Sequence, residues 1–131
     1  MTTAREIVAA HYAASAAGDI QGAFSNFADD IVWTESAGGR YAGTYTSMAE
    51  VYEKVFGRIQ QDWEDFAAHL DYLIADNDNN KVAAVVNYHG KSTATGKSQN
   101  VRVVHLWTIK DGMVVAFEQV ADTAEQNKAL S

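Results

Sequence analysis

Apolar residues recur every three to four positions near the start of the chain, a spacing typical of amphipathic helices. Residues 3–17 follow this spacing, and Gly18 comes next as a C-cap. Asp19 provides an N-cap for a short second helix that extends towards Phe27. The first part of the chain is therefore predicted to be helical.

A third helix is predicted over residues 47–59 because it starts with a capping box. Ser47 is an N-cap residue, and Glu50 follows three positions later. The apolar stripe of this helix consists of Met48, Val51, Tyr52, Val55 and Phe56.

Strand patterns occupy most of the remaining chain. Residues 31–35 form a short candidate strand that places Trp33 and Glu35 on one face, and residues 36–43 read as a loop. Residues 63–75 and 81–89 are longer candidates, joined by a polar turn over residues 76–80. Residues 90–99 form the far end of a hairpin. Helices followed by an antiparallel meander predict an α+β fold, with a ligand site in the concave gap between helices and sheet.

Residues 101–123 predict a hairpin around Asp111 and Gly112. In its first strand, His105 and Trp107 share a face because they are two positions apart. A two-residue turn would pair Lys110 with Met113 and place Glu118 opposite His105. A three-residue turn with a bulge at Gly112 would place Phe117 opposite His105. We favour the second register because it turns the side chains of Phe117, Gln119 and Ala121 inward.

Composition narrows the class of protein. A chain of 131 residues predicts one domain over residues 1–131, and the absence of cysteine excludes disulfide and thiolate chemistry. The net charge of −7 argues against nucleic acid and anionic membranes as partners. No signal peptide or membrane-length apolar run is recognised, so a cytoplasmic location is expected. The four histidines lack metal-ligand spacing, so neither a metal nor another cofactor is expected.

Several short motifs resemble the NTF2-like superfamily, which includes ketosteroid isomerase and the SnoaL-like polyketide cyclases. They are Ala-Ala-Gly-Asp at 16–19, Phe-Ala-Asp-Asp-Ile-Val-Trp at 27–33, Gly43, and Trp107 followed by Asp-Gly-Met-Val at 111–114. The resemblance covers nearly the whole chain. It implies a cone-shaped barrel in which the N-terminal helices pack on a curved antiparallel sheet.

The resemblance also implies functional positions. The general-base aspartate of the isomerases corresponds to Glu35, and their oxyanion-hole tyrosine corresponds to His11, beside Tyr12. Their second oxyanion-hole group, a protonated aspartate, corresponds to His105, where SnoaL-like cyclases resemble this chain in having a histidine. Gln119 stands where cyclases and epoxide hydrolases carry an acid, and glutamine cannot transfer protons at neutral pH.

Two functions therefore remain open. The first is an isomerase or cyclase that transfers a proton next to a carbonyl, with Glu35, His105, His11 and Tyr12 as catalytic residues. The second is a non-catalytic ligand-binding or dimeric interaction domain. In both, the ligand is a small apolar molecule with a carbonyl or hydroxyl group, and the chain forms a homodimer through the outer sheet face, where Val104, Leu106 and Val120 lie. The predicted substrate-binding residues are Trp33, Tyr52, Trp107, Phe117 and Gln119.

Overall fold

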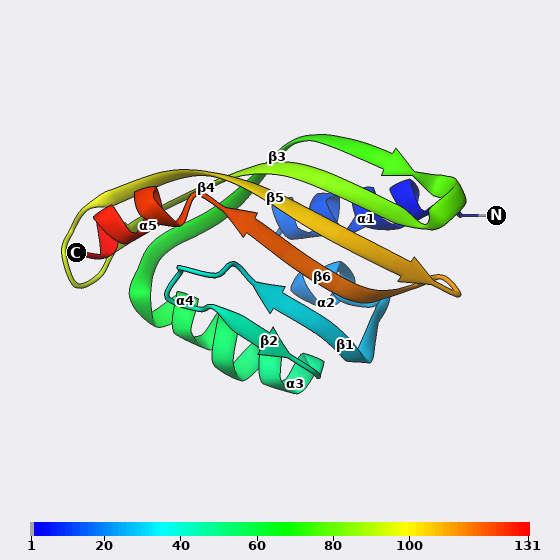
Figure 1. The fold of residues 1–131 in the computed structure, drawn as a ribbon, viewed down its shortest axis with the longest axis horizontal. Helices are drawn as coiled ribbons and strands as arrows, with labels where there is room; N and C mark the ends of the chain where they lie inside the picture. The colour runs from blue at the N-terminus through cyan, green and yellow to red at the C-terminus, as the bar shows by residue number, and fades with distance from the viewer. Residues whose placement is uncertain (1) are drawn as a thin grey trace.

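Helices cover a curved, six-stranded sheet in the computed structural model of the protein, which describes residues 2–131 (Figure 1). The helices are α1 (Ala4–Ala16), α2 (Ile20–Ala23), α3 (Met48–Val51), α4 (Gly57–Asp62) and α5 (Thr123–Leu130), with a π-helical turn η1 (Tyr52–Phe56) and a 3₁₀ turn η2 (Asn77–Asn79). The strands are β1 (Phe27–Glu35), β2 (Gly43–Tyr45), β3 (Trp63–Asp76), β4 (Lys81–Ser92), β5 (Ser98–Lys110) and β6 (Met113–Ala121). The predicted α+β class is confirmed.

Polar side chains fix where the helices begin. The carboxylate of Asp19 accepts a hydrogen bond from the backbone N–H of Gly22 at 2.9 Å, as expected for an N-cap. The hydroxyl of Ser47 accepts one from the backbone N–H of Glu50 at 3.1 Å. The second helix is shorter than predicted, because Phe27 already belongs to β1.

The third helical segment runs without a break through α3, η1 and α4 to Asp62. Helix α5 is an element that the sequence pattern did not predict. Its N-cap is Asp122, whose carboxylate accepts from the backbone N–H of Glu125 at 3.2 Å.

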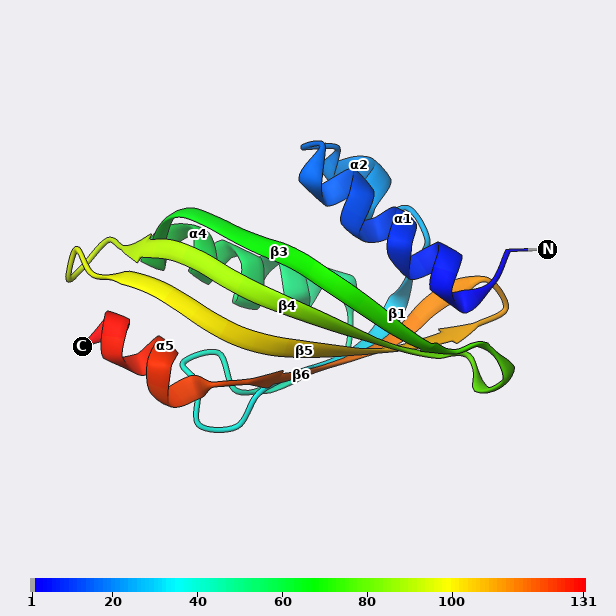
Figure 2. The same ribbon diagram turned by 90° about the horizontal axis from the view of Figure 1, so that it is seen from above.

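The sheet has the strand order β2-β1-β6-β5-β4-β3 and does not close into a complete barrel (Figure 1). Strands β3 to β6 form the predicted antiparallel meander. Strand β1 pairs with β6 in parallel, so the sheet is mixed rather than purely antiparallel. Figure 2 shows α1 and α2 together on one side of the sheet.

The β5–β6 hairpin combines features of both predicted registers. Asp111 and Gly112 have φ angles of 51° and 77°, and Lys110 pairs with Met113, so the turn has two residues and the predicted three-residue turn is wrong. A bulge between the Thr108 and Ile109 pairings then shifts the register by one residue. Gln119, rather than Phe117 or Glu118, therefore lies opposite His105, and the predicted inward direction of Phe117 and Gln119 is confirmed.

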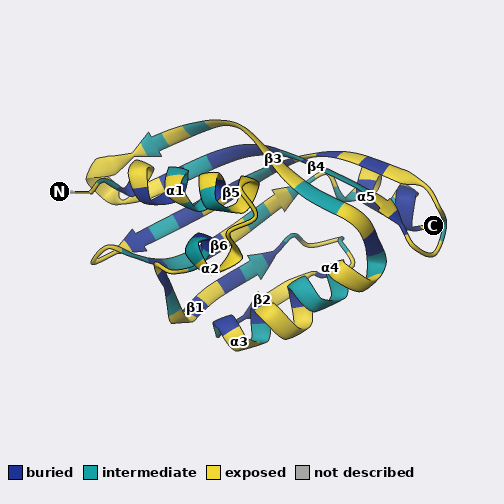
Figure 3. Cartoon of the chain, turned by 180° about the vertical axis from the view of Figure 1, so that it is seen from behind, coloured by how far each residue is buried: buried dark blue, intermediate teal, exposed yellow. Residues whose placement is uncertain are grey.

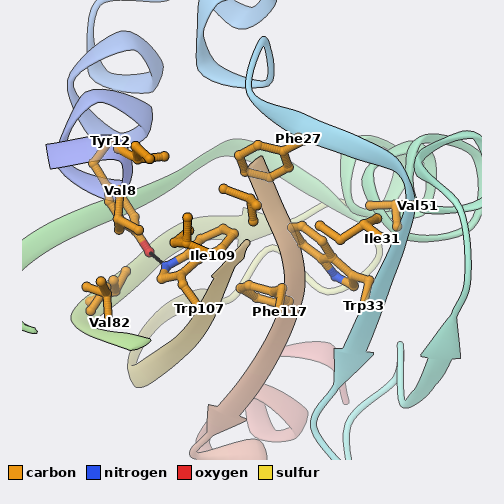
Figure 4. Packing of buried hydrophobic residues seen from close by; sticks show 14 of the residues in the cluster. Val8, Tyr12, Phe27, Ile31, Trp33, Val51, Val82, Trp107, Ile109 and Phe117 are labelled. Carbon is orange, nitrogen blue, oxygen red and sulfur yellow. Dashed lines mark hydrogen bonds between the residues drawn. The ribbon is translucent and has the colours of Figure 1, made fainter. Parts of the chain in front are cut away.

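Burial alternates along β5, as the banding in Figure 3 shows. His105 and Trp107 face the core, whereas Leu106 is 39% exposed on the other face. Trp107 lies at the centre of an aromatic cluster with Trp33 and Phe117 (Figure 4). The rings of Trp33 and Phe117 stack on each other at a centroid distance of 3.8 Å. None of the described helices has both the length and the apolar character needed to cross a membrane.

Candidate active site

A cavity of about 430 Å³ lies between the helices and the inner sheet face. Its apolar walls include Phe24, Trp33, Phe56, Trp63, Trp107 and Phe117. The polar groups that line it include Tyr12, Glu35, Tyr88 and His105, three of which come from three different strands. A second hollow, of about 550 Å³, lies over the outer sheet face around Leu106 and Ile74. Of these two hollows, only the inner cavity is lined by several buried ionisable groups. We therefore take the inner cavity as the candidate active site.

Glu35 is a buried carboxyl group at the end of β1, with 4% of its surface exposed. The indole N–H of Trp33 donates a hydrogen bond to its Oε2 at 3.1 Å. Burial raises the pKa of Glu35 to about 7, an effect that hydrogen bonds from Trp33 and Gln119 only partly oppose. Glu35 can therefore hold or release a proton near neutral pH.

His105 lies between two tyrosine hydroxyl groups. Its Nδ1 is 2.5 Å from the hydroxyl oxygen of Tyr12, and its Nε2 is 2.5 Å from that of Tyr88. Burial and, to a smaller extent, the nearby His11 together lower the pKa of His105 to about 3. The imidazole is therefore neutral, and both of its nitrogens are engaged by protein groups.

The two tyrosines are themselves held by donors on neighbouring strands. The indole N–H of Trp107 donates to the hydroxyl oxygen of Tyr12 at 3.0 Å, the bond drawn in Figure 4. The side-chain N–H of Gln119 donates to the hydroxyl oxygen of Tyr88 at 2.9 Å. Burial also holds the pKa values of Tyr12 and Tyr88 above their usual range, so both hydroxyls keep their protons.

His11 lines the same cavity but is anchored away from the network. Its Nδ1 lies 2.8 Å from the carbonyl oxygen of Ala23 and must donate to it, because a carbonyl oxygen only accepts. Its ring packs against Phe24, Phe27 and Trp107. His11 therefore links α1 to α2 and contributes to the aromatic wall.

Most of the predicted site residues meet at this cavity. They are His11, Tyr12, Trp33, Glu35, His105, Trp107 and Phe117. Gln119 lies behind Tyr88 and borders a smaller hollow that also reaches Glu35. Tyr52 does not line the cavity. Its side chain is 46% exposed beside Phe24 and Phe56, because the helical segment directs Val51 and Val55 inward instead.

Tyr88 is the main site residue that the sequence analysis missed. It lies on β4, four positions from Ala84, which pairs with His105. Residues separated by an even number share a sheet face, so Tyr88 faces the cavity as His105 does. Only the β4–β5 register reveals this relation, since nothing local marks Tyr88. No cluster of three potential metal-binding side chains occurs among residues 2–131.

Comparison with known families agrees with this geometry. Residues 8–117 match the model of the SnoaL-like domain. The chain belongs to the SnoaL-like domain family. The resemblance predicted from the sequence motifs is thereby confirmed.

Solved structures with the same fold include an NTF2-like protein of Burkholderia thailandensis E264, which is 40% identical with a TM-score of 0.93. The match covers 100% of this SnoaL-like chain and 99% of the other. A candidate polyketide cyclase of Pseudomonas putida KT2440 is 16% identical, with a TM-score of 0.80 and 100% of both chains covered. A candidate isomerase of Rhodopseudomonas palustris is 19% identical, with a TM-score of 0.70 and 92% and 90% covered. No curated protein sequence matches the chain.

Proposed function

We propose that this SnoaL-like protein binds a small, largely apolar carbonyl compound and transfers a proton next to the carbonyl, as an isomerase or a cyclase does. The observation that carries the proposal is Glu35, a buried carboxyl with a pKa of about 7 that faces the same apolar cavity as the hydroxyl of Tyr12. A general base works best when its pKa lies near the working pH. The names of the cyclase and isomerase neighbours agree with this class of chemistry.

The proposed reaction begins when the Glu35 carboxylate removes a proton from the carbon next to the carbonyl. The electron pair of the broken C–H bond then forms a C=C bond, and negative charge develops on the carbonyl oxygen. The hydroxyl of Tyr12 donates a hydrogen bond to that oxygen, assisted by the indole N–H of Trp107, which donates to Tyr12. Glu35 finally returns the proton to the same carbon, as in hydrogen exchange, or to a carbon that a C=C bond of the substrate conjugates with the enolate, as in isomerisation. The electron pair on the oxygen then re-forms the C=O bond. The aromatic walls exclude water, which strengthens these interactions.

In this proposal His105 is a positioning residue rather than a donor to the substrate. Both of its nitrogens are engaged by Tyr12 and Tyr88, so no ring N–H is free to reach a ligand. His11 is engaged at Nδ1 by the carbonyl of Ala23 and presents an unprotonated Nε2. In this proposal His105 holds the hydroxyl of Tyr12 in place and His11 shapes the cavity, and neither acts on the substrate directly.

A binding domain without catalysis is the alternative. The full pairing of His105 with two tyrosines favours it, because such a network also serves as a rigid core. A single measurement separates the two functions, because only the enzyme exchanges hydrogen on a bound ketone.

The first prediction concerns the pH dependence of that exchange. With 1-tetralone as the probe in D₂O, the second-order rate of exchange at the carbon next to the carbonyl should rise with pH. It should level off above a midpoint near pH 7, because the Glu35 carboxyl must lose its proton to act as a base. Proton NMR at low ketone concentration measures the rate, with buffer alone as the blank. A midpoint near 4.5, the ordinary value for glutamate, would contradict the assignment of Glu35 as a buried base.

We also propose that two copies of the chain associate through the outer sheet face. Four apolar side chains from four strands are exposed there, at 46% for Val32, 39% for Leu106, 59% for Ile74 and 51% for Val120. Apolar residues gathered on one face are typical of a surface that another protein covers.

The second prediction tests this interface. Leu106→Lys should shift the wild-type dimer towards monomer, because it places a charge in an apolar contact. Sedimentation velocity over a range of concentrations measures the change. The control is Ile20→Lys, an exposed apolar position on α2, which should leave the assembly intact. A wild type that is monomeric at high micromolar concentration would exclude the interface.

A further inference from the structure

Three hydrogen bonds around His105 have a fixed direction, because in each of them only one partner can donate. The backbone N–H of Ser36 donates to the side-chain oxygen of Gln119 at 3.2 Å, which orients the Gln119 amide. Its nitrogen therefore faces Tyr88 and donates to the hydroxyl oxygen. On the other side, the Trp107 indole, which can only donate, does the same for Tyr12. Each phenol oxygen thus already accepts one hydrogen bond before His105 is considered.

The remaining hydrogens outnumber the contacts that need them. The contacts of His105 with Tyr12 and with Tyr88 require one hydrogen each. A neutral imidazole supplies one N–H, and the two phenols supply one O–H each. Three hydrogens therefore serve two contacts, and one phenolic O–H remains over. No further hydrogen-bond partner of either phenol oxygen is found within residues 2–131.

The tautomer of His105 decides which tyrosine keeps the unused hydrogen. When Nδ1 carries the proton, it donates to Tyr12, Tyr88 donates to Nε2, and the O–H of Tyr12 is free. When Nε2 carries the proton, it donates to Tyr88, Tyr12 donates to Nδ1, and the O–H of Tyr88 is free. Both phenols border the cavity that contains Glu35, so either free O–H can meet a ligand there.

We propose that Tyr88 is a second hydroxyl donor of the site, and that His105, by changing tautomer, presents one ligand-directed O–H at a time, from Tyr12 or from Tyr88. The two nitrogens lie on opposite edges of the ring, so the two donor positions lie on either side of His105. A ligand oxygen that bears negative charge can thus accept a hydrogen bond from Tyr12 or from Tyr88 while His105 stays neutral. The inference rests on the proposed function only in its choice of ligand class, a carbonyl compound or its enolate.

The test uses 1-naphthol, an aromatic analogue of the enol of 1-tetralone, and the protein labelled with ¹⁵N at histidine. The ¹⁵N signals of a neutral imidazole distinguish the protonated nitrogen from the unprotonated one. In the free wild type, both His105 nitrogens should give signals averaged between the two tautomers. Addition of 1-naphthol should move them towards a single tautomer. Signals that do not change at saturation, or a probe that fails to bind at millimolar concentration, would overturn the proposal.

Two single variants sharpen the result. With 1-naphthol bound, Tyr12→Phe leaves Tyr88 as the only donor and should hold the proton on Nε2 of His105. Tyr88→Phe leaves Tyr12 and should hold the proton on Nδ1. The same tautomer in both complexes would contradict alternate donation. If the network had only a structural role, the ¹⁵N signals of His105 would change with each substitution but not when 1-naphthol is added.

The affinities of the same variants provide a second readout. Each single variant retains one donor, so its loss of affinity for 1-naphthol should be small. Tyr12→Phe/Tyr88→Phe retains none and should lose about 10- to 100-fold beyond the product of the two singles, the cost of leaving the buried oxygen of the probe without any donor. If the double variant instead loses only the product of the two single losses of affinity, one tyrosine alone donates to the ligand. The wild-type ¹⁵N measurement stands even where the double variant does not fold. Because these readouts need binding only, they hold even where ketone exchange, and with it the proposed enzyme function, fails.

Discussion

Glu35→Gln is expected to lower the rate of hydrogen exchange in bound 1-tetralone by about 10²- to 10⁴-fold, the usual contribution of a general base. Glutamine has nearly the shape of glutamate, and its side-chain oxygen can still accept the hydrogen bond that Trp33 donates. The variant therefore removes the basic group and leaves the cavity walls in place. Proton NMR in D₂O at pH 8, where the wild-type carboxyl is ionised, gives both rates.

The matched control is Glu53→Gln, which makes the same chemical change at an exposed position on η1. It should exchange the ketone hydrogens at the wild-type rate. Binding of the ketone, followed by tryptophan fluorescence from Trp33 and Trp107 in the cavity wall, should be similar in all three proteins. Equal exchange rates in wild type and Glu35→Gln would exclude the proposed base and favour the binding domain.

Local patterns in the sequence were sufficient to predict which residues of β1 and β5 face the cavity. Trp33 and Glu35 share a face of β1 because they are two positions apart, and His105 and Trp107 share a face of β5 for the same reason. The capping residues Asp19 and Ser47 could be recognised because their partners lie only three positions away. Such relations depend on the chain itself and not on how distant elements pack.

Relations between distant elements were not predictable in this way. The bulge in β6 has no local signature, yet it decides that Gln119 lies opposite His105. Tyr88 reaches His105 only through the β4–β5 register. Tyr52 has the right helical spacing for the core stripe, but a π-helical turn begins there and its ring remains half exposed. Tertiary packing decides each of these cases.

Burial of Glu35 should also make the stability of the protein depend on pH in an unusual direction. Its pKa rises from 4.5 to about 7 on folding, so the folded state holds the proton more tightly than the unfolded state does. Below about pH 4.5 Glu35 is protonated in both states and does not lower the free energy of unfolding. As the pH rises from about 4.5 to about 7, Glu35 ionises in the unfolded chain but not in the folded protein, so the unfolded state is stabilised and the free energy of unfolding falls. The loss amounts to about 3 kcal/mol at pH 8, at 1.36 kcal/mol for each unit of pKa.

Replacement of the carboxyl by a neutral amide removes this loss. Glu35→Gln should therefore unfold at a higher urea concentration than the wild type at pH 8, with a gain in the free energy of unfolding of up to about 3 kcal/mol. At pH 4.5 the gain should nearly vanish, because Glu35 is then protonated in the folded protein. Urea titrations at both pH values, with Glu53→Gln as the exposed control, measure the difference. A variant that is no more stable than the wild type at pH 8 would show that the Glu35 carboxylate is well solvated or paired, and the raised pKa on which the proposed base depends would be wrong. A variant that gains stability at pH 8 while losing ketone exchange would show that the protein tolerates a destabilising carboxyl group for the sake of its chemistry.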